Sequence, residues 1–190
     1  MPSIVAKFDS IVKNYFDRYR ALNELPPIIA GQVEGRLSKD MPKTLKYEEE
    51  NGILLWGRPD DFLEVKDGKT VPFDHKTKSK SPNGVHPAYQ LQMSTYSHLL
   101  QMSGYTTTNK AFISYYFPGY SELHNGMTIN CTVLEVITDP NQVKDLINRA
   151  YEILSGPMPD PGIHCEFCKW AQVMIENESI PSLPSGALEV

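Results

Sequence analysis

Residues 57–80 read GRPDDFLEVKDGKTVPFDHKTKSK, and this stretch of the chain decides the fold. Two strand-like runs flank Lys66-Asp67-Gly68, a sequence typical of a tight turn. A three-residue loop with Gly68 in the left-handed conformation pairs Val65 with Lys69 and thereby sets the register of both runs. The sequence therefore predicts an antiparallel β-hairpin here.

The predicted register assigns the side chains of the hairpin to two faces, because side chains alternate along a strand. One face carries the apolar residues Leu63, Val65, Val71 and Phe73. The other face carries Arg58, Asp60, Phe62, Asp74, Lys76 and Lys78. We expect the apolar face to pack on the core.

On the second face, the register places Asp60 directly opposite Asp74. Such carboxylates have Cβ atoms about 5 Å apart and repel each other. A divalent cation would relieve the repulsion, because Mg²⁺ is commonly held by one or two carboxylates with waters and phosphates. Lys76 follows on the same face, where it can orient a water or stabilise charge on a phosphate. A second interpretation stays open, in which this face is solvated and Lys76 simply pairs with an aspartate.

The rest of the chain alternates between helical and strand-like patterns. Helical periodicity, prolines at helix starts and glycines just after helix ends together predict helices over 3–22, 28–39, 87–103 and 140–155. Runs of β-branched and aromatic residues predict strands over 44–50, 53–65, 70–77, 109–118 and 127–138. This order favours the α/β (mixed α+β) class, with a central mixed sheet flanked by helices.

Composition limits the class of protein. The chain has 190 residues, a net charge of −5 and three cysteines. No apolar run approaches the roughly 18–20 residues that span a bilayer, and the N-terminus lacks the layout of a signal peptide. We therefore expect an intracellular, cytoplasmic protein without a membrane partner. Its acidity means that binding to nucleic acid would need a local basic patch or bound cations.

The predicted helix after the hairpin carries two polar residues on one face. Gln92 and Tyr96 are four residues apart and therefore neighbours on a helix. A glutamine aimed at the hairpin can hydrogen-bond a metal-bound water, a phosphate or Lys76. Alternatively, Gln92 lies at the surface and Tyr96 is a core aromatic.

Three short motifs in this order resemble a known family. Gly57-Arg58-Pro59-Asp60 resembles its G-x-x-D element, and Asp74-His75-Lys76-Thr77 resembles its D-x-K-T element. Gln92 and Tyr96 resemble its Q-x-x-x-Y element. Together they are similar to the RecB-like branch of the PD-(D/E)XK nucleases, which includes the CRISPR-associated RecB-like exonucleases.

The resemblance implies a restriction-endonuclease-like core and hydrolysis of DNA phosphodiesters with Mg²⁺ or Mn²⁺. Asp60, Asp74 and the backbone carbonyl of His75 would bind the metal. Lys76 would position the attacking water, and the glutamine and tyrosine would complete the catalytic set. Many members carry an upstream histidine ligand where this chain has Gly31-Gln32-Val33-Glu34, so Glu34 is the candidate for that role.

The expected substrate is DNA, cut by an exonuclease acting on single strands or exposed ends. Arg58, Lys78 and Lys80 are the candidate substrate-binding residues. A local basic rim would add Lys43, Lys46 and Lys110. The aromatic residues Tyr115, Tyr116, Phe117 and Tyr120 either stack on unpaired bases or, as we favour, belong to a core strand. A helicase, repair, CRISPR or phage partner follows from analogy alone.

The cysteines indicate no metal centre of their own. Cluster-bearing relatives use four cysteines, whereas this chain has Cys131, Cys165 and Cys168, so we expect no iron–sulfur cluster. A structural zinc at the last two would need a further ligand, such as His164 or His124. We expect these thiols to pack in a C-terminal turn. A redox role lacks the βαβ context it would need.

We expect one nuclease-like domain over residues 1–178. It comprises a helical part (1–40), a core (41–156) and a Cys-x-x-Cys part (157–178), followed by a disordered tail (179–190). Two other functions stay open: a catalytically inactive module that binds nucleic acid or protein on the same fold, and a small redox or metal-binding protein. Polarity of digestion and preference for DNA over RNA do not follow from the sequence.

Overall fold

The computed structural model describes residues 4–39, 42–50 and 52–176. The chain separates into two compact units, residues 1–149 and 150–190. Each unit is described by itself. The predicted disordered tail, 179–190, lies outside the described residues.

Four α-helices and seven strands make up the described chain. The helices are α1 (Ile4–Leu22), α2 (Pro87–Met102), α3 (Pro140–Ser155) and α4 (Glu166–Glu176). The strands are β1 (Arg36–Leu37), β2 (Leu45–Glu48), β3 (Leu54–Gly57), β4 (Asp61–Val65), β5 (Lys69–Thr77), β6 (Lys110–Pro118) and β7 (Ile129–Ile137). Short 3₁₀ turns occupy Lys66–Gly68 and Leu123–Asn125. The expected mixed α/β class is confirmed.

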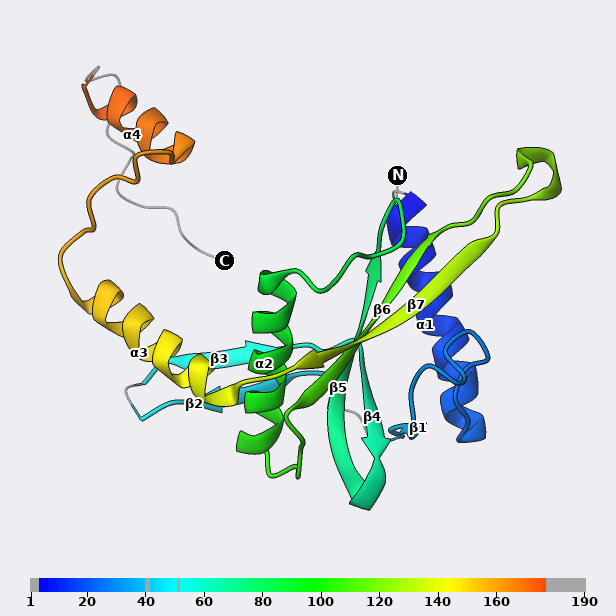
Figure 1. Ribbon diagram of the computed structural model, residues 1–190. Helices are drawn as coiled ribbons and strands as arrows, with labels where there is room; N and C mark the ends of the chain where they lie inside the picture. The colour runs from blue at the N-terminus through cyan, green and yellow to red at the C-terminus, as the bar shows by residue number, and fades with distance from the viewer. Residues whose placement is uncertain (1–3, 40–41, 51, 177–190) are drawn as a thin grey trace, which may run out of the picture. The chain divides into compact units, whose positions relative to one another are not determined.

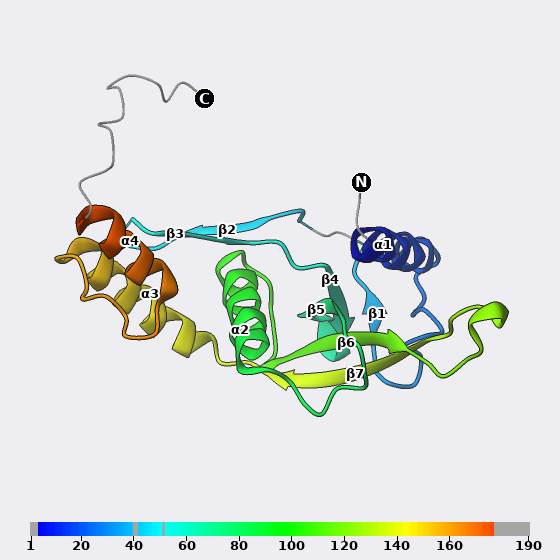
Figure 2. The ribbon, with the colours of Figure 1, turned by 90° about the horizontal axis from the view of Figure 1, so that it is seen from above.

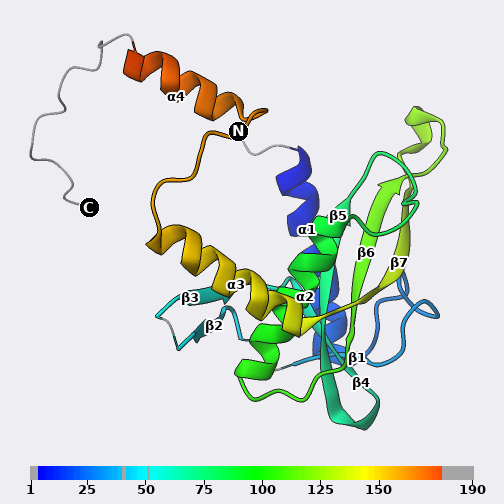
Figure 3. The ribbon, with the colours of Figure 1, turned by 60° about the vertical axis from the view of Figure 1, so that its left-hand side comes forward.

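The first unit is built on a five-stranded sheet with the order β1-β4-β5-β6-β7 (Figure 1). β5 and β6 run parallel, and the other neighbouring strands run antiparallel. A parallel pair needs a crossover connection, which α2 supplies. β7 forms one edge of the sheet, beside β6 (Figure 3). β2 and β3 form a separate antiparallel pair.

The predicted register of the hairpin is confirmed. Val65 pairs with Lys69, and Leu63 pairs with Val71. Gly68 takes the expected left-handed conformation, with φ of +68°. The ladder ends where Asp61 pairs with Phe73, so the predicted pairing of Asp60 with Asp74 is not part of it, and Asp60 precedes β4 as a bend residue.

Helices cover both faces of the hairpin (Figure 2). On one face, α1 closes a core that contains Val12, Phe16, Ile29, Val33, Leu37, Leu63, Val71, Phe73 and Tyr116. On the other face, α2 packs in two clusters, formed by Met93, Tyr96, Ala111, Ile113, Tyr115 and Val136, and by Leu45, Phe62, Leu99 and Leu100. Asp74 lies on this second face and is 2% exposed. The interpretation of that face as solvated is therefore wrong at Asp74, whereas the pairing of Lys76 with an aspartate, which that interpretation included, is present.

Two predicted elements were wrong. Residues 28–39 form turns and the short strand β1 instead of a helix. Gly35 has φ of +118°, and a Cβ there would lie 2.5 Å from the carbonyl oxygen of Glu64, so this segment bends and closely approaches β4. The predicted strand 53–65 is two strands, β3 and β4. Pro59 interrupts it, because proline has no N–H to donate to a ladder.

The second unit carries α4 and the Cys-x-x-Cys sequence. None of the side chains of residues 150–175 is buried. Across the part of the chain that the structure describes, no helix combines the length and apolar character needed to cross a membrane.

Candidate active site

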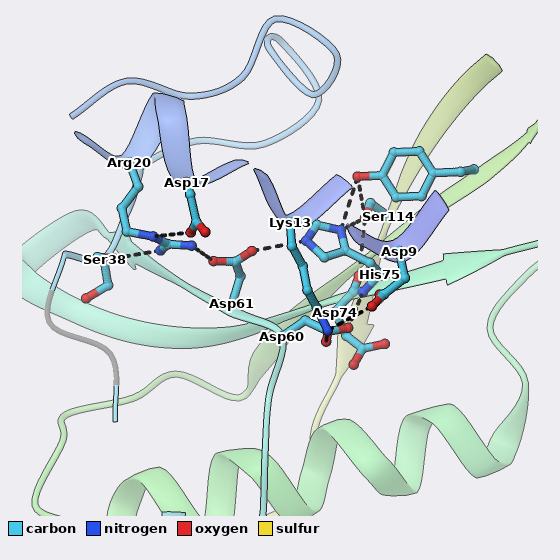
Figure 4. Close-up of polar contacts among 11 residues, drawn as sticks. Asp9, Lys13, Asp17, Arg20, Ser38, Asp60, Asp61, Asp74, His75 and Ser114 are labelled. Atoms are coloured by element: carbon cyan, nitrogen blue, oxygen red, sulfur yellow. Dashed lines mark hydrogen bonds and ion pairs between the residues drawn. The ribbon is translucent and has the colours of Figure 1, made fainter. Parts of the chain in front are cut away.

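The site lies where β5 extends beyond β4. From Asp74 onward β5 pairs with β6 on one side, whereas its ladder with β4 has ended at Phe73. Asp60 occupies the place that a further β4 residue would take. Its Oδ2 accepts a hydrogen bond from the backbone N–H of His75 at 3.2 Å. The end of the ladder thus brings the Asp60 and Asp74 carboxylates together (Figure 4).

Asp74 is a buried carboxylate with one cationic partner. The ammonium of Lys76 lies 2.5 Å from its Oδ2. Burial raises the pKa of Asp74 to about 6, and the nearby Asp60 charge adds to this, although Lys76 opposes it. An ionised Asp74 therefore lacks full compensation from the protein alone.

The two lysines of the site approach from different elements. Lys76, on β5, also lies over the ring of Tyr89 at 4.9 Å. Lys13, on α1, lies 3.7 Å from Asp60 Oδ1 and 3.1 Å from Asp9 Oδ2. The hydrogen bond to Asp9 and the Asp60 charge raise the pKa of Lys13 against the effect of burial. The sequence predicted this helix but not that Lys13 reaches the site, for which the available signal was the i,i+4 spacing of Asp9 and Lys13.

Gln92 and Tyr96 lie behind the Asp60 loop. Gln92 Nε2 donates to the Tyr96 hydroxyl at 3.0 Å, and that hydroxyl donates to the carbonyl of Arg58 at 3.3 Å. Gly57 leaves room for the ring, since a Cβ there would meet Tyr96 Cε1 at 2.8 Å. The pair therefore positions the segment that carries Asp60, and the glutamine reaches the hairpin through the tyrosine.

A second polar network lies on the α1 face of the sheet. Asp61, which is 2% exposed, forms an ion pair with Arg20 and lies 3.0 Å from His75 Nε2. His75 Nδ1 is 2.6 Å from the Ser114 hydroxyl and 3.1 Å from that of Tyr116. Figure 4 shows this network running from α1 through the hairpin to β6. It joins α1 to the strands that carry the site.

A family model described as the PD-(D/E)XK nuclease superfamily matches residues 7–173. The chain belongs to this superfamily. The crystal structure of SSO0001 is similar in fold, with a TM-score of 0.45 and 15% identity, over 90% of this chain and 70% of that one. No curated protein matches the chain significantly.

The PD-(D/E)XK superfamily consists of metal-dependent nucleases, so the residues of the site can be compared with the ligands that a divalent cation prefers. Asp74 Oδ2 is buried and lies 2.5 Å from the Lys76 ammonium, which only partly offsets the effect of burial on the pKa of Asp74. Within the described residues, no group of three or more His, Cys, Asp and Glu side chains is arranged to hold a metal. Two carboxylates and a carbonyl nevertheless fit Mg²⁺ or Mn²⁺, which take hard oxygen ligands and keep several waters.

Glu34 is not brought to this PD-(D/E)XK centre. It lines a cavity with Lys66 and Asp67, at the turn end of the hairpin, because residues 28–39 do not form the helix that was expected to carry it. The predicted upstream ligand is therefore separated from Asp60 and Asp74 by the length of β4.

The predicted substrate-binding cations fall into two cavities. Arg58 lines a cavity with Asp60, and its Nε donates to the Thr44 hydroxyl at 3.1 Å. Lys78 and Lys80 line a separate cavity formed by the loop from β5 to α2. Of the predicted rim, Lys43 joins the Arg58 cavity, whereas Lys110 lies 2.9 Å from Glu135 in the cavity at the hairpin turn.

The other predicted groups lie elsewhere. Tyr115 and Tyr116 are buried in β6, as favoured, whereas Tyr120 is fully exposed. Cys131 is half-buried on β7, and burial raises the pKa of its thiol to about 11. In the second unit, Cys165 Sγ accepts the backbone N–H of Cys168 at 3.3 Å, and the hydrogen bonds from Cys168 lower the pKa of the Cys165 thiol.

Proposed function

We propose that this protein is a Mg²⁺- or Mn²⁺-dependent deoxyribonuclease. The observation that carries the proposal is the buried Asp74 carboxylate, which lies beside Asp60 and Lys76 at the open edge of β5. A fold stabilised only by its own contacts gains nothing from an incompletely compensated buried charge. Such a charge is expected at an active site that binds a cation.

Asp60, Asp74 and the His75 carbonyl would hold the divalent ion, which lowers the pKa of a bound water and stabilises charge on the phosphate. Lys76 lies close enough to Asp74 to share this centre. Its ammonium would orient the attacking water and donate to a phosphate oxygen as negative charge develops. Lys13 would contribute positive charge from the α1 side.

We further propose that the substrate is single-stranded or end-exposed DNA and that cleavage is exonucleolytic. The support is the resemblance to RecB-like exonucleases in the three motifs at Asp60, Asp74 and Gln92-to-Tyr96. Tyr96 has a defined part in this proposal, because its hydroxyl holds the Arg58 carbonyl and with it the Asp60 loop.

A hydrolysis assay tests the proposal. End-labelled single- and double-stranded DNA is incubated with Mg²⁺, Mn²⁺ or EDTA and with wild type, Asp74→Ala or Asp145→Ala. The last is a matched control on the exposed face of α3. We expect wild type and Asp145→Ala to cut with metal, and Asp74→Ala to be inactive while folded.

Cleavage by purified Asp74→Ala would contradict the assignment of Asp74. DNA binding without cleavage by wild type, under every metal condition, would instead favour the inactive binding module on the same fold.

A further inference from the structure

A cavity of about 500 Å³ lies directly beside Asp60. Its walls come from the second half of α1, from the segment before β2 and from the loop between β3 and β4. It contains an unusual share of the chain's cations, namely Lys13, Arg20, Lys39, Lys43 and Arg58. In a chain with a net charge of −5, this concentration of positive charge needs a physical reason.

The acidic residues of the cavity already have partners. Asp17 and Asp61 both pair with Arg20, and Asp60 lies near Lys13. These interactions involve two of the five cations, Lys13 and Arg20. The carboxylates of the cavity therefore do not neutralise its remaining positive charge.

Lys39, Lys43 and Arg58 provide that remaining charge. Within the ranges 4–39, 42–50 and 52–176, none of them forms an ion pair with a carboxylate. Arg58 Nε donates to the Thr44 hydroxyl at 3.1 Å, and no carboxylate of the described residues pairs with the terminal nitrogens, which can therefore bind an oxyanion in a forked geometry. The cavity is therefore suited to a phosphate group.

The position of the cavity indicates which phosphate group of the substrate it would bind. Arg58 and Asp60 belong to one short loop, and Tyr96 fixes that loop at the Arg58 carbonyl. An anion bound by the guanidinium therefore lies next to the proposed reacting centre. Lys78 and Lys80 line another cavity beyond Lys76, so cations flank the centre on both sides.

We propose that Lys39, Lys43 and Arg58 form a phosphate-binding subsite, which holds the substrate strand next to the bond that is cut. The proposal rests on the proposed function for the identity of the substrate. The phosphate is either an internal phosphodiester or a terminal phosphate at a strand end. The subsite would provide this acidic protein with the local positive charge that binding to a polyanion requires.

Binding measured in EDTA tests the subsite independently of hydrolysis. Fluorescent single-stranded oligonucleotides with a 5′-phosphate, a 5′-hydroxyl or a 3′-phosphate are titrated with wild type, Lys39→Ala/Lys43→Ala, Arg58→Gln and the control Lys144→Ala/Lys169→Ala. Both control lysines are exposed and lie outside the cavity. Circular dichroism confirms that each variant is folded.

We expect about tenfold weaker binding for each cavity variant and no change for the control. The slope of log K against log salt should also become shallower by about 0.7 for each phosphate of a single strand that the variant no longer neutralises. An equal weakening on all three oligonucleotides identifies an internal phosphodiester. A weakening confined to one phosphorylated end identifies a terminal phosphate.

Binding and salt slopes that match the control would overturn the subsite, as would a wild type that binds no oligonucleotide. The two proposals fail separately. A wild type that binds through these cations but never cleaves contradicts only the nuclease, and a wild type that cleaves while the cavity variants bind normally contradicts only the subsite.

Discussion

Asp74 is a carboxylate that the fold buries at a cost in stability. Its pKa in the folded protein is about 6, compared with an ordinary value of 3.8. Ionisation therefore weakens the folded state as the pH rises between these two values, and the cost is present in full above them. The same charge attracts a divalent cation, so stability and proposed function are opposed at this residue.

We predict that Asp74→Asn is more stable than wild type in EDTA. At pH 7.5, its free energy of unfolding should be higher by about 2 kcal/mol, because the amide carries no charge to bury. The difference should disappear below about pH 3, where the aspartate is protonated in both states. Urea unfolding at the two pH values measures this. A less stable variant at pH 7.5 would show that Asp74 is fully compensated without metal.

Asp61 differs from its neighbour Asp60 in having a structural role. Replacing it with alanine leaves the Arg20 and His75 side chains, which are 16% and 5% exposed, without their shared carboxylate. We predict a loss of about 3 kcal/mol in the free energy of unfolding. Asp17→Ala is the matched control, since Asp17 pairs with the same arginine but is 66% exposed, and it should cost less than about 1 kcal/mol. Equal losses in urea unfolding would argue against the buried network.

At the scale of elements, the site depends on how α2 supports the loop between β3 and β4. Tyr96 is buried and reaches the Arg58 carbonyl, while Gly57 lies against its ring. The helix that connects the two parallel strands therefore also fixes the position of Asp60 relative to β5.

We predict that Tyr96→Phe lowers kcat about tenfold while KM changes little, because the Asp60 loop loses a hydrogen bond that holds it. The accompanying loss of stability should be about 1 kcal/mol. Tyr105→Phe serves as the control, since Tyr105 packs at the other end of α2 against the Leu45 cluster. Steady-state kinetics on single-stranded DNA separate the two parameters. An unchanged kcat would show that Tyr96 contributes to core packing but not to the position of Asp60.

The hairpin could be predicted from sequence because its determinants are local. Alternation over a few residues and the Lys66-to-Gly68 turn together define its register, including the pairing that ends at Asp61. The interactions of Lys13 and Arg20 could not be predicted, because they depend on where α1 docks, and helical periodicity does not encode the docking partner. Likewise, a helix was expected over residues 28–39, whereas the close approach of Gly35 to β4 is a tertiary requirement that the local sequence does not encode.

At the scale of the whole molecule, the buried core lies in the first unit. The three core clusters contain no residue beyond Val136, and the last buried residue of α3 is Ile147. Residues 150–175 contribute no buried side chain.

We therefore predict that a chain ending at Ser155 keeps the midpoint of thermal unfolding within about 2 °C of the full chain, since about 1 kcal/mol shifts it by 2–4 °C at this size. Differential scanning calorimetry of the two proteins measures this. A drop of more than about 8 °C would show that the second unit stabilises the first.

The most direct test of the proposed active centre is the single-turnover rate of DNA hydrolysis with Mn²⁺ in Asp74→Ala, Lys76→Ala and the double variant. Groups that act as one unit are not additive, so removing either should cost nearly as much as removing both. We predict that each single variant loses at least about 100-fold in rate and that the double variant is no slower. Near wild-type hydrolysis by either folded single variant would contradict an active centre built on Asp74 and Lys76.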